Sequence, residues 1–119
     1  MHNFEKLIFW QKSISLAKKI YLISQKISSD EKYGLISQMK RSAISIPSNI
    51  AEGSGRNSDN EFNHFLAISL GSAFEMQTQL ILSKELELLD DVTVNDLIAD
   101  VSEIQKMIYS FKNNLLKKS

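Results

Sequence analysis

The stretch RSAISIPSNIAEGSGR, residues 41–56, combines a helical pattern with the only proline of the chain. Apolar residues recur at helical spacing up to Ile46, and this spacing continues past Pro47 through Ile50 and Ala51. A proline inside a helix removes one backbone hydrogen bond, here to the carbonyl of Ala43, and costs about 3 kcal/mol or bends the helix. The stretch therefore predicts a helix that is kinked near Pro47.

Apolar residues recur every three or four positions along the rest of the chain too, and the pattern offers no candidate strand. We expect one helix over residues 9–27 and a second from Asp30 to Gly53, where glycine suits the C′ position because it takes positive φ without strain. Two further helices follow. Short links between helices of similar length predict an all-α, antiparallel up-down-up-down four-helix bundle that forms a single domain over residues 1–119.

Short polar motifs mark where three of the helices begin. Ser28 with Glu31, and Ser58 with Glu61, have the spacing of capping boxes, in which a hydroxyl and a carboxylate satisfy backbone N–H groups at a helix start. Thr93 is the expected cap of the last helix. We therefore expect the second helix to begin near residue 30 and the third after Ser58.

The third and fourth helices differ in the width of their apolar faces. The fourth has a regular seam of the coiled-coil type, formed by Val94, Leu97, Val101, Ile104, Ile108, Phe111 and Leu115. The apolar residues of the third cover about half of its circumference at 100° per residue, namely Phe62, Phe65, Leu66, Leu70, Ala73, Phe74, Leu80 and Ile81. A lone bundle would leave part of that surface in water, so we expect a homo-oligomer.

Composition excludes several classes of protein. The 119 residues are 43% hydrophobic and 24% charged, which is typical of a compact domain with a core. The absence of cysteine excludes disulfides, thiolate metal sites and thiol nucleophiles. No unbroken apolar run approaches the roughly 18 residues that span a bilayer, so we expect a soluble cytoplasmic protein with no membrane partner.

A polar stripe runs beside the apolar arc of the proline-containing helix. At 100° per residue it comprises Gln38, Arg41, Ser42, Ser45, Asn49, Glu52 and Arg56. Four of these seven side chains are neutral hydrogen-bonding groups, whereas solvated faces usually favour Lys and Glu. Two interpretations stay open: an ordinary wet face, or a polar network buried between helices or subunits.

Sites for metal or catalysis are poorly supported. Di-iron bundles need two inward Glu-x-x-His motifs, but only Glu61 and His64 match, and His64 is expected to face solvent. The sequence GSGR lacks the features of a phosphate-binding P-loop. Gly71 suggests close approach of a neighbouring backbone. We therefore expect no cofactor, no metal and no enzymatic activity.

Charge is divided unevenly between the two halves of the chain. Residues 1–56 contain nine Lys/Arg and four Asp/Glu, and residues 57–119 contain five and ten. Lys12, Lys19 and Lys26 recur every seven residues and form a line of cations along the first helix. Such a line suits weak, non-specific binding of RNA or DNA through phosphates, although a simple solubilising face is the alternative.

Three segments, LIFWQKS, YGLISQMKRSAISIPSNIAEGSGR and EFNHFLAISLGSAFEMQTQL, resemble the four-helix bundle family of 23S rRNA intervening-sequence proteins. The resemblance implies a small bacterial protein, often encoded in insertions within large-subunit rRNA genes, that assembles as a ring-like homopentamer. A related branch assists the reverse transcriptase of diversity-generating retroelements and binds nucleic acid.

The family motif falls on the polar stripe and on the third helix. Its matching positions are Gln38, Arg41, Ser45, Asn49, Glu52, Gly53, Arg56, Gly71 and Glu75. The resemblance assigns no catalytic role to them, and we interpret them as structural or interfacial. It favours a non-enzymatic homo-oligomer; the alternative is an adaptor for a reverse transcriptase or another nucleic-acid enzyme, and a bundle-core metalloenzyme is least favoured.

Overall fold

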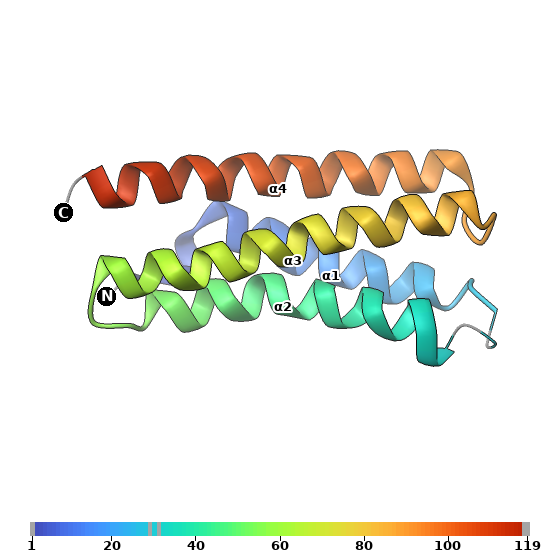
Figure 1. Ribbon diagram of the computed structural model, residues 1–119, viewed down its shortest axis with the longest axis horizontal. Helices are drawn as coiled ribbons and strands as arrows, with labels where there is room; N and C mark the ends of the chain where they lie inside the picture. Colours follow the sequence, from blue (N-terminus) through green and yellow to red (C-terminus); the bar gives the residue numbers. More distant parts are fainter. Residues whose placement is uncertain (1, 29, 31, 118–119) are drawn as a thin grey trace.

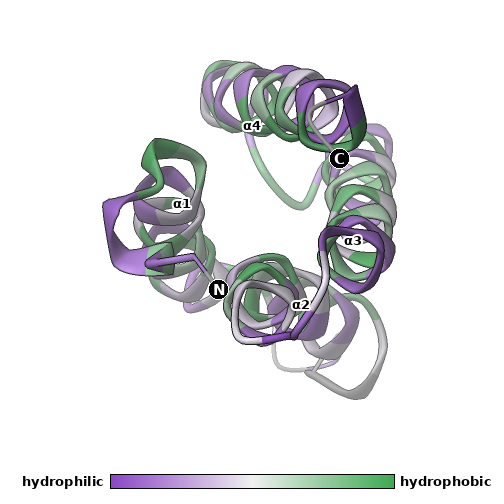
Figure 2. Ribbon diagram, turned by 90° about the vertical axis from the view of Figure 1, so that its left-hand side faces the viewer, coloured by the Kyte–Doolittle hydropathy of each residue, from purple (hydrophilic) through white to green (hydrophobic). Residues whose placement is uncertain are grey.

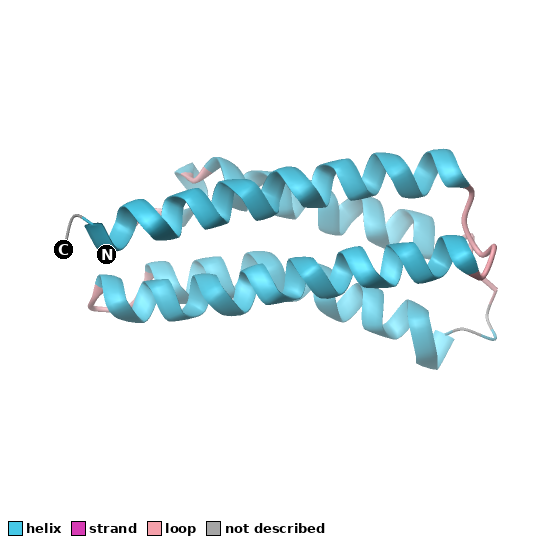
Figure 3. Ribbon diagram, turned by 45° about the horizontal axis from the view of Figure 1, so that its top comes forward, coloured by secondary structure: helices cyan, strands magenta, loops and turns pink. Residues whose placement is uncertain are grey.

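The protein is described by a computed structural model over residues 2–28, 30 and 32–117, and this part of the chain contains helices and no strand (Figure 3). The helices are α1 (Ile8–Ser24), α2 (Ser37–Ser54), α3 (Asp59–Glu85) and α4 (Asp91–Lys117), preceded by a short 3₁₀ turn, η1 (Phe4–Lys6). The elongated molecule measures 47 × 22 × 19 Å, and successive helices run back and forth along it (Figure 1). The predicted all-α, four-helix fold is confirmed.

The four helices surround one apolar core, as an end-on view shows (Figure 2). α2 packs most extensively against α3. Among the four pairs of neighbouring helices around the bundle, α1 and α4 contact each other least. The most deeply buried side chains include Leu16, Ile20, Met39, Ile46, Ile50, Phe62, Leu66, Met76, Leu80, Ile104 and Ile108. The weakly packed side of the bundle is therefore the seam between α1 and α4.

The predicted seam of α4 is confirmed, because all its members are buried except the partly buried Phe111. That ring closes one end of the core, packing edge-on against Phe9 and Phe62 at centroid distances of 5.2 and 5.7 Å. The N-terminal segment joins this cluster through His2, whose ring lies 4.8 Å from that of Phe62. The backbone N–H of His2 also donates to the carbonyl of Ser54 at 3.0 Å.

One predicted helix cap is confirmed and another is wrong. Ser58 Oγ accepts from the backbone N–H of Glu61 at 3.1 Å, as an N-cap does, and it donates to the Glu61 carboxylate at 3.2 Å, so the carboxylate binds the hydroxyl of Ser58 and not its backbone N–H as a full capping box would. α4, however, is capped by Asp90, whose Oδ1 accepts from the N–H of Thr93 at 2.6 Å. This hydrogen bond, which favours the ionised carboxylate, lowers the pKa of Asp90 from its ordinary value. Thr93 is thus a recipient of the cap and lies inside the helix.

The second helix begins later than predicted. A π-type turn (Lys32–Ile36) precedes α2, and Gly34 within it has non-helical angles, φ −100° and ψ −105°. Glycine tolerates such angles at little steric cost, so the chain changes direction there and regular helix starts at Ser37. The predicted capping box of Ser28 falls partly outside the described residues, because Glu31 does.

Gly53 does not end α2 in the predicted way. The helix continues to Ser54, and the described glycines all have negative φ. Gly53 instead permits close packing: a Cβ atom there would lie 2.7 Å from Phe65 Cβ and 2.8 Å from Phe62 Cδ1. Its role is to let α3 approach α2.

Pro47 lies inside a helix assignment that is continuous from Ser37 to Ser54, so the kink near it stays a prediction. The ring of Pro47 is buried. The carbonyl of Ile46, which forms the peptide bond to Pro47, accepts a hydrogen bond from Ser69 Oγ of α3 at 2.8 Å. This contact ties α3 to α2 beside the proline.

α3 is apolar on more than one side. By length and composition it is apolar enough to cross a bilayer, with a mean hydropathy of 1.2 over its most apolar window, a third of which is buried in the bundle. This reflects apolar residues interspersed with Ser, Thr and Gln, a pattern that the search for unbroken apolar runs does not detect. The soluble, cytoplasmic interpretation stays a prediction.

Candidate functional site

Part of the predicted polar stripe forms a hydrogen-bonded cluster along the seam between α2 and α3. Ser45 Oγ lies 2.7 Å from Ser72 Oγ of α3. Asn49 Nδ2 donates to Ser45 Oγ at 3.0 Å and to the carbonyl of Ser45 at 2.9 Å. The small serine side chains let the two helices lie close while their hydroxyls stay hydrogen-bonded, so this part of the stripe is a polar network between helices.

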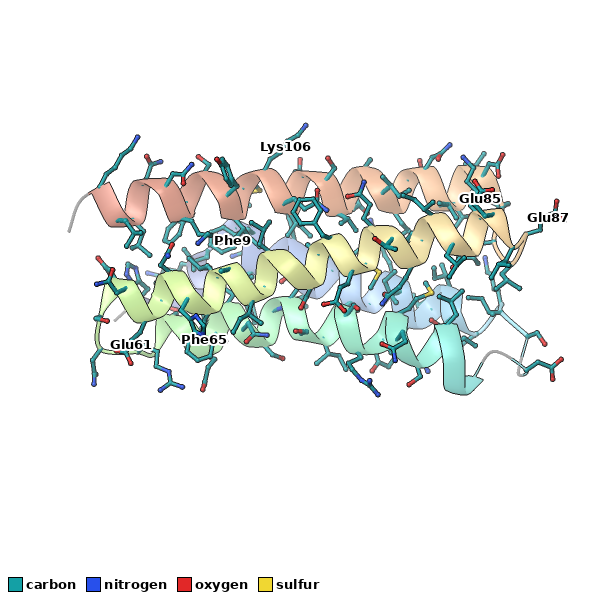
Figure 4. All side chains as sticks on the ribbon, viewed as in Figure 1. Phe9, Glu61, Phe65, Glu85, Glu87 and Lys106 are labelled. Atoms are coloured by element: carbon teal, nitrogen blue, oxygen red, sulfur yellow. The ribbon has the colours of Figure 1, made fainter. Side chains whose placement is uncertain are left out.

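Arg56 occupies the end of the stripe near the α2–α3 link. Its guanidinium donates to Glu52 Oε1 at 2.8 Å and lies 4.7 Å from the ring centroid of Phe65. Figure 4 shows Phe65 at the boundary between α3 and α2. Because the side chains of Arg56 and Glu52 are about half exposed, the ion pair contributes at most about 1 kcal/mol to stability, and its main effect is to orient Arg56 over the ring.

The remaining predicted site residues, two from the stripe and Glu75 of α3, have no such contacts. Gln38, Arg41 and Glu75 are exposed, and none forms a hydrogen bond or ion pair with another described residue. Ser42, by contrast, is buried. Within the predicted set, Ser45 and Asn49 thus form one hydrogen-bonded group, and Glu52 and Arg56 form a separate ion pair.

One buried polar atom on this side was not anticipated from the sequence. Gln79 Oε1 of α3 is buried and has no hydrogen-bond partner among the described residues. A buried acceptor without a donor costs about 1–3 kcal/mol. Gln79 follows Ser72 by two helical turns, so it continues the side of α3 that faces α2.

The line of lysines lies on another side of the molecule, where α1 faces α4. Lys12 Nζ is 2.7 Å from Glu103 Oε1, and Lys19 Nζ is 2.8 Å from Asp100 Oδ2. The hydrogen bond to Glu103 raises the pKa of Lys12. Lys26 forms no ion pair with a described residue. Two of the three ammonium groups are therefore partly neutralised by α4, across the least packed seam of the bundle.

No cluster of three or more His, Asp or Glu side chains that could hold a metal ion occurs within the described residues, 2–28, 30 and 32–117. His64 is exposed, as predicted, and packs edge-on against Phe65 at a centroid distance of 5.5 Å.

Several surface grooves have appreciable apolar lining, and three of them lie between neighbouring helices. A groove of about 570 Å³ lies between the start of α1 and α4, beside Phe9 and Lys106, which points away from the bundle in Figure 4. A second, of about 320 Å³, lies between α1 and α2, and a third, of about 200 Å³, between α3 and α4. Each is an open depression between neighbouring helices, and none contains a catalytic set of side chains among the described residues.

Fold and surface together define a four-helix bundle whose conspicuous features are a polar inter-helix network and exposed apolar grooves. A family model described as 23S rRNA-intervening sequence protein matches residues 5–110, and the chain belongs to this family. A crystal structure at 1.70 Å of a protein with unknown function from the S23 ribosomal protein family of Bacteroides thetaiotaomicron VPI-5482 is similar to it. That similarity has a TM-score of 0.83 and 26% identity, and covers 89% of this chain and 96% of the other. No functionally curated protein matches the chain.

Proposed function

We propose that the protein is a non-enzymatic assembly module that acts as a homo-oligomer, a pentamer if it follows the family that it belongs to. The observation that carries this proposal is the outward side of α3. Four large apolar side chains of this helix, Ile68, Phe74, Ile81 and Leu82, are each 40–53% exposed. Several large apolar side chains exposed on one helix are typical of an interaction site when they form a patch.

The polar stripe supports the same proposal. Gln38, Arg41 and Glu75 are exposed and form no hydrogen bond or ion pair with another described residue. A second subunit could supply their partners. This arrangement favours the interfacial interpretation of the stripe over that of a solvated face.

The experiment that tests the proposal is a measurement of molar mass in solution. Light scattering coupled to size exclusion at tens of micromolar is expected to give a multiple of the subunit mass of 13.5 kDa. Burial of apolar area on association is favourable by about 25 cal/mol per Å². Because this free energy does not come from charge attraction, the assembly should persist at high salt. A monomer mass at that concentration would refute the proposal.

Weak nucleic-acid binding is a second candidate function. Lys12 and Lys19 lie on the same side of α1, and a symmetric oligomer would repeat that side in every subunit. A phosphate that binds Lys12 or Lys19 must, however, compete with the carboxylate of α4 that pairs with that lysine, which lowers the expected affinity. Nucleic-acid binding therefore stays a prediction.

A titration of labelled RNA tests this candidate. We expect binding at low salt that is lost at physiological salt, because phosphate contacts release counterions. Changing Lys12, Lys19 and Lys26 together to Gln should flatten the salt dependence, whereas Lys117→Gln, on a different helix, serves as the control. If the wild type does not bind even at low salt, the candidate is wrong, and a protein partner such as a reverse transcriptase becomes the better search.

A further inference from the structure

The outward side of α3 has the form of a helix-packing surface, and we call it the α3 outer face: Ile68, Gly71, Phe74, Ile81 and Leu82. Gly71 lies between Ile68 and Phe74, about one helical turn from each, and a Cβ atom there would have no heavy atom of the described chain within 4 Å beyond its own helical turns. A glycine within a helix costs about 1 kcal/mol relative to alanine. The close neighbour predicted for Gly71 is thus absent from the described part of its own subunit, and a second chain could supply it.

Another side of the bundle contains an apolar depression, the α1/α2 groove of about 320 Å³. It is lined by Phe4, Trp10, Ile14, Ala17, Ile44, Pro47, Ser48 and Ala51. Ile14 and Ile44 are 44% and 47% exposed, so large apolar side chains border the groove on both helices. End-on, α1, α2, α3 and α4 follow one another around the core, so the outer side of the α1/α2 pair faces away from that of the α3/α4 pair, although α2 adjoins α3 (Figure 2).

The charges beside the two surfaces are opposite. Lys18, Lys40 and Arg41 lie within one helical turn of Ile14 or Ile44, while Glu75 and Glu85 lie beside the α3 outer face. None of these five forms an ion pair with a described residue; Lys40 instead lies 5.0 Å from the ring centroid of Tyr21. The helices as a whole follow the same division. α1 and α2 carry five Lys/Arg and one Glu, whereas α3 and α4 carry four Lys and eight Asp/Glu.

We propose that the α3 outer face of one copy of this chain docks into the α1/α2 groove of a second copy. This inference rests on the proposed homo-oligomer and names the two surfaces that form it. The two surfaces differ, so the contact is heterologous, and it can repeat from copy to copy until a ring closes. A symmetric contact of α3 with α3 would bring Glu75 and Glu85 of both copies together and leave the groove uncovered.

Two charge-introducing variants test the docking. Ile44→Glu places a carboxylate in the groove opposite Glu75 and Glu85, and Phe74→Lys places an ammonium group opposite the basic edge of the groove. Each variant alone is expected to be monomeric by analytical ultracentrifugation at tens of micromolar, with the helical circular dichroism of the wild type. Leu22→Glu, at a 55% exposed position of α1 outside both surfaces, should keep the mass of the wild type.

Mixing the two variants gives the decisive result. The first retains an intact α3 outer face and the second an intact groove, so an equimolar mixture can form one good contact and no more. We expect a 1:1 heterodimer of twice 13.5 kDa, although neither variant associates alone. A mixture that stays monomeric, or Ile44→Glu that still dimerises by itself, would overturn the heterologous docking.

The outcome for the wild type separates this inference from the proposed function. If the wild type is a monomer, the homo-oligomer is wrong and the docking with it. If the wild type is an oligomer and both variants keep its mass, the assembly stands, but these two surfaces do not form it.

Discussion

Replacing Gly53 by alanine is expected to lower the free energy of unfolding by about 1–3 kcal/mol, the usual cost of adding volume to a packed site. The new Cβ atom would lie 2.7 Å from Phe65 Cβ, 2.8 Å from Phe62 Cδ1 and 3.3 Å from the carbonyl oxygen of Phe62. Phe65 Cβ is attached directly to the α3 backbone and cannot rotate away, so α2 and α3 must separate. Alanine also gains about 1 kcal/mol in helix propensity over glycine. This gain offsets part of the packing cost, so the net loss should lie toward the lower end of the range.

Gly55→Ala is the matched control for that variant. A Cβ atom at Gly55 would meet only the carbonyl oxygens of Glu52 and Ala51, at the ordinary distances of 3.7 and 3.9 Å. Urea unfolding of both variants should be followed at two protein concentrations, because the stability of an oligomer depends on concentration. Equal stability of the two variants would show that the contact of Gly53 with α3 is not tight.

The helices could be predicted from the sequence because their apolar residues repeat with the period of the helix. The regular seam from Val94 to Leu115 is visible in its own spacing, and the N-cap of Ser58 depends only on the nearby residue Glu61. These features depend on residues a few positions apart. Such local features can be predicted without knowing which other elements pack against them.

The features that the sequence did not predict depend on neighbours that are distant in the chain. Gly53 has the local signal of a helix end, and only the approach of Phe62 and Phe65 makes it a packing residue. Thr93 and Asp90 are both residue types that cap helices well. Which of them is the N-cap depends on where the link before α4 turns into the helix, and in the structure this is at Asp90. Local pattern alone cannot settle either choice.

The candidate site was predicted on both helices, but on α3 the predicted site residue was Glu75, whereas the contact is made by Ser72. The spacing of Ser45 and Asn49 placed them on one stripe, but their partner Ser72 depends on the register of α2 against α3. The ion pairs of Lys12 and Lys19 could have been predicted from the spacing of acidic residues on α4. Glu103 and Asp100 are three residues apart on α4, on one helical side, as a partner for an antiparallel lysine line would require.

Replacing Phe62 by alanine should have the largest effect on stability, a loss of about 3–5 kcal/mol. Phe62 is 1% exposed and joins α3 to the cluster of His2 and Phe111 at the end of the core. Small domains are stable by about 5–15 kcal/mol in total, so the variant should be close to unfolding at ambient temperature. Leu22→Ala, at an exposed site, is the control and should unfold within about 0.5 kcal/mol of the wild type. A loss below about 1 kcal/mol at Phe62 would contradict the buried cluster.

Combining Gly53→Ala with Phe62→Ala tests whether the two residues act through one contact. Removing the ring takes away Cδ1, one of the two atoms closest to the new Cβ, and leaves the contact with Phe65 Cβ at 2.7 Å. The methyl group introduced at position 53 would also fill part of the space that the ring vacates. The double variant should therefore lose less stability than the two single losses added together, by roughly 0.5–3 kcal/mol, the range found for residues in contact. Strict additivity would mean that the α2–α3 crossing adjusts to the new methyl group through Phe65 alone.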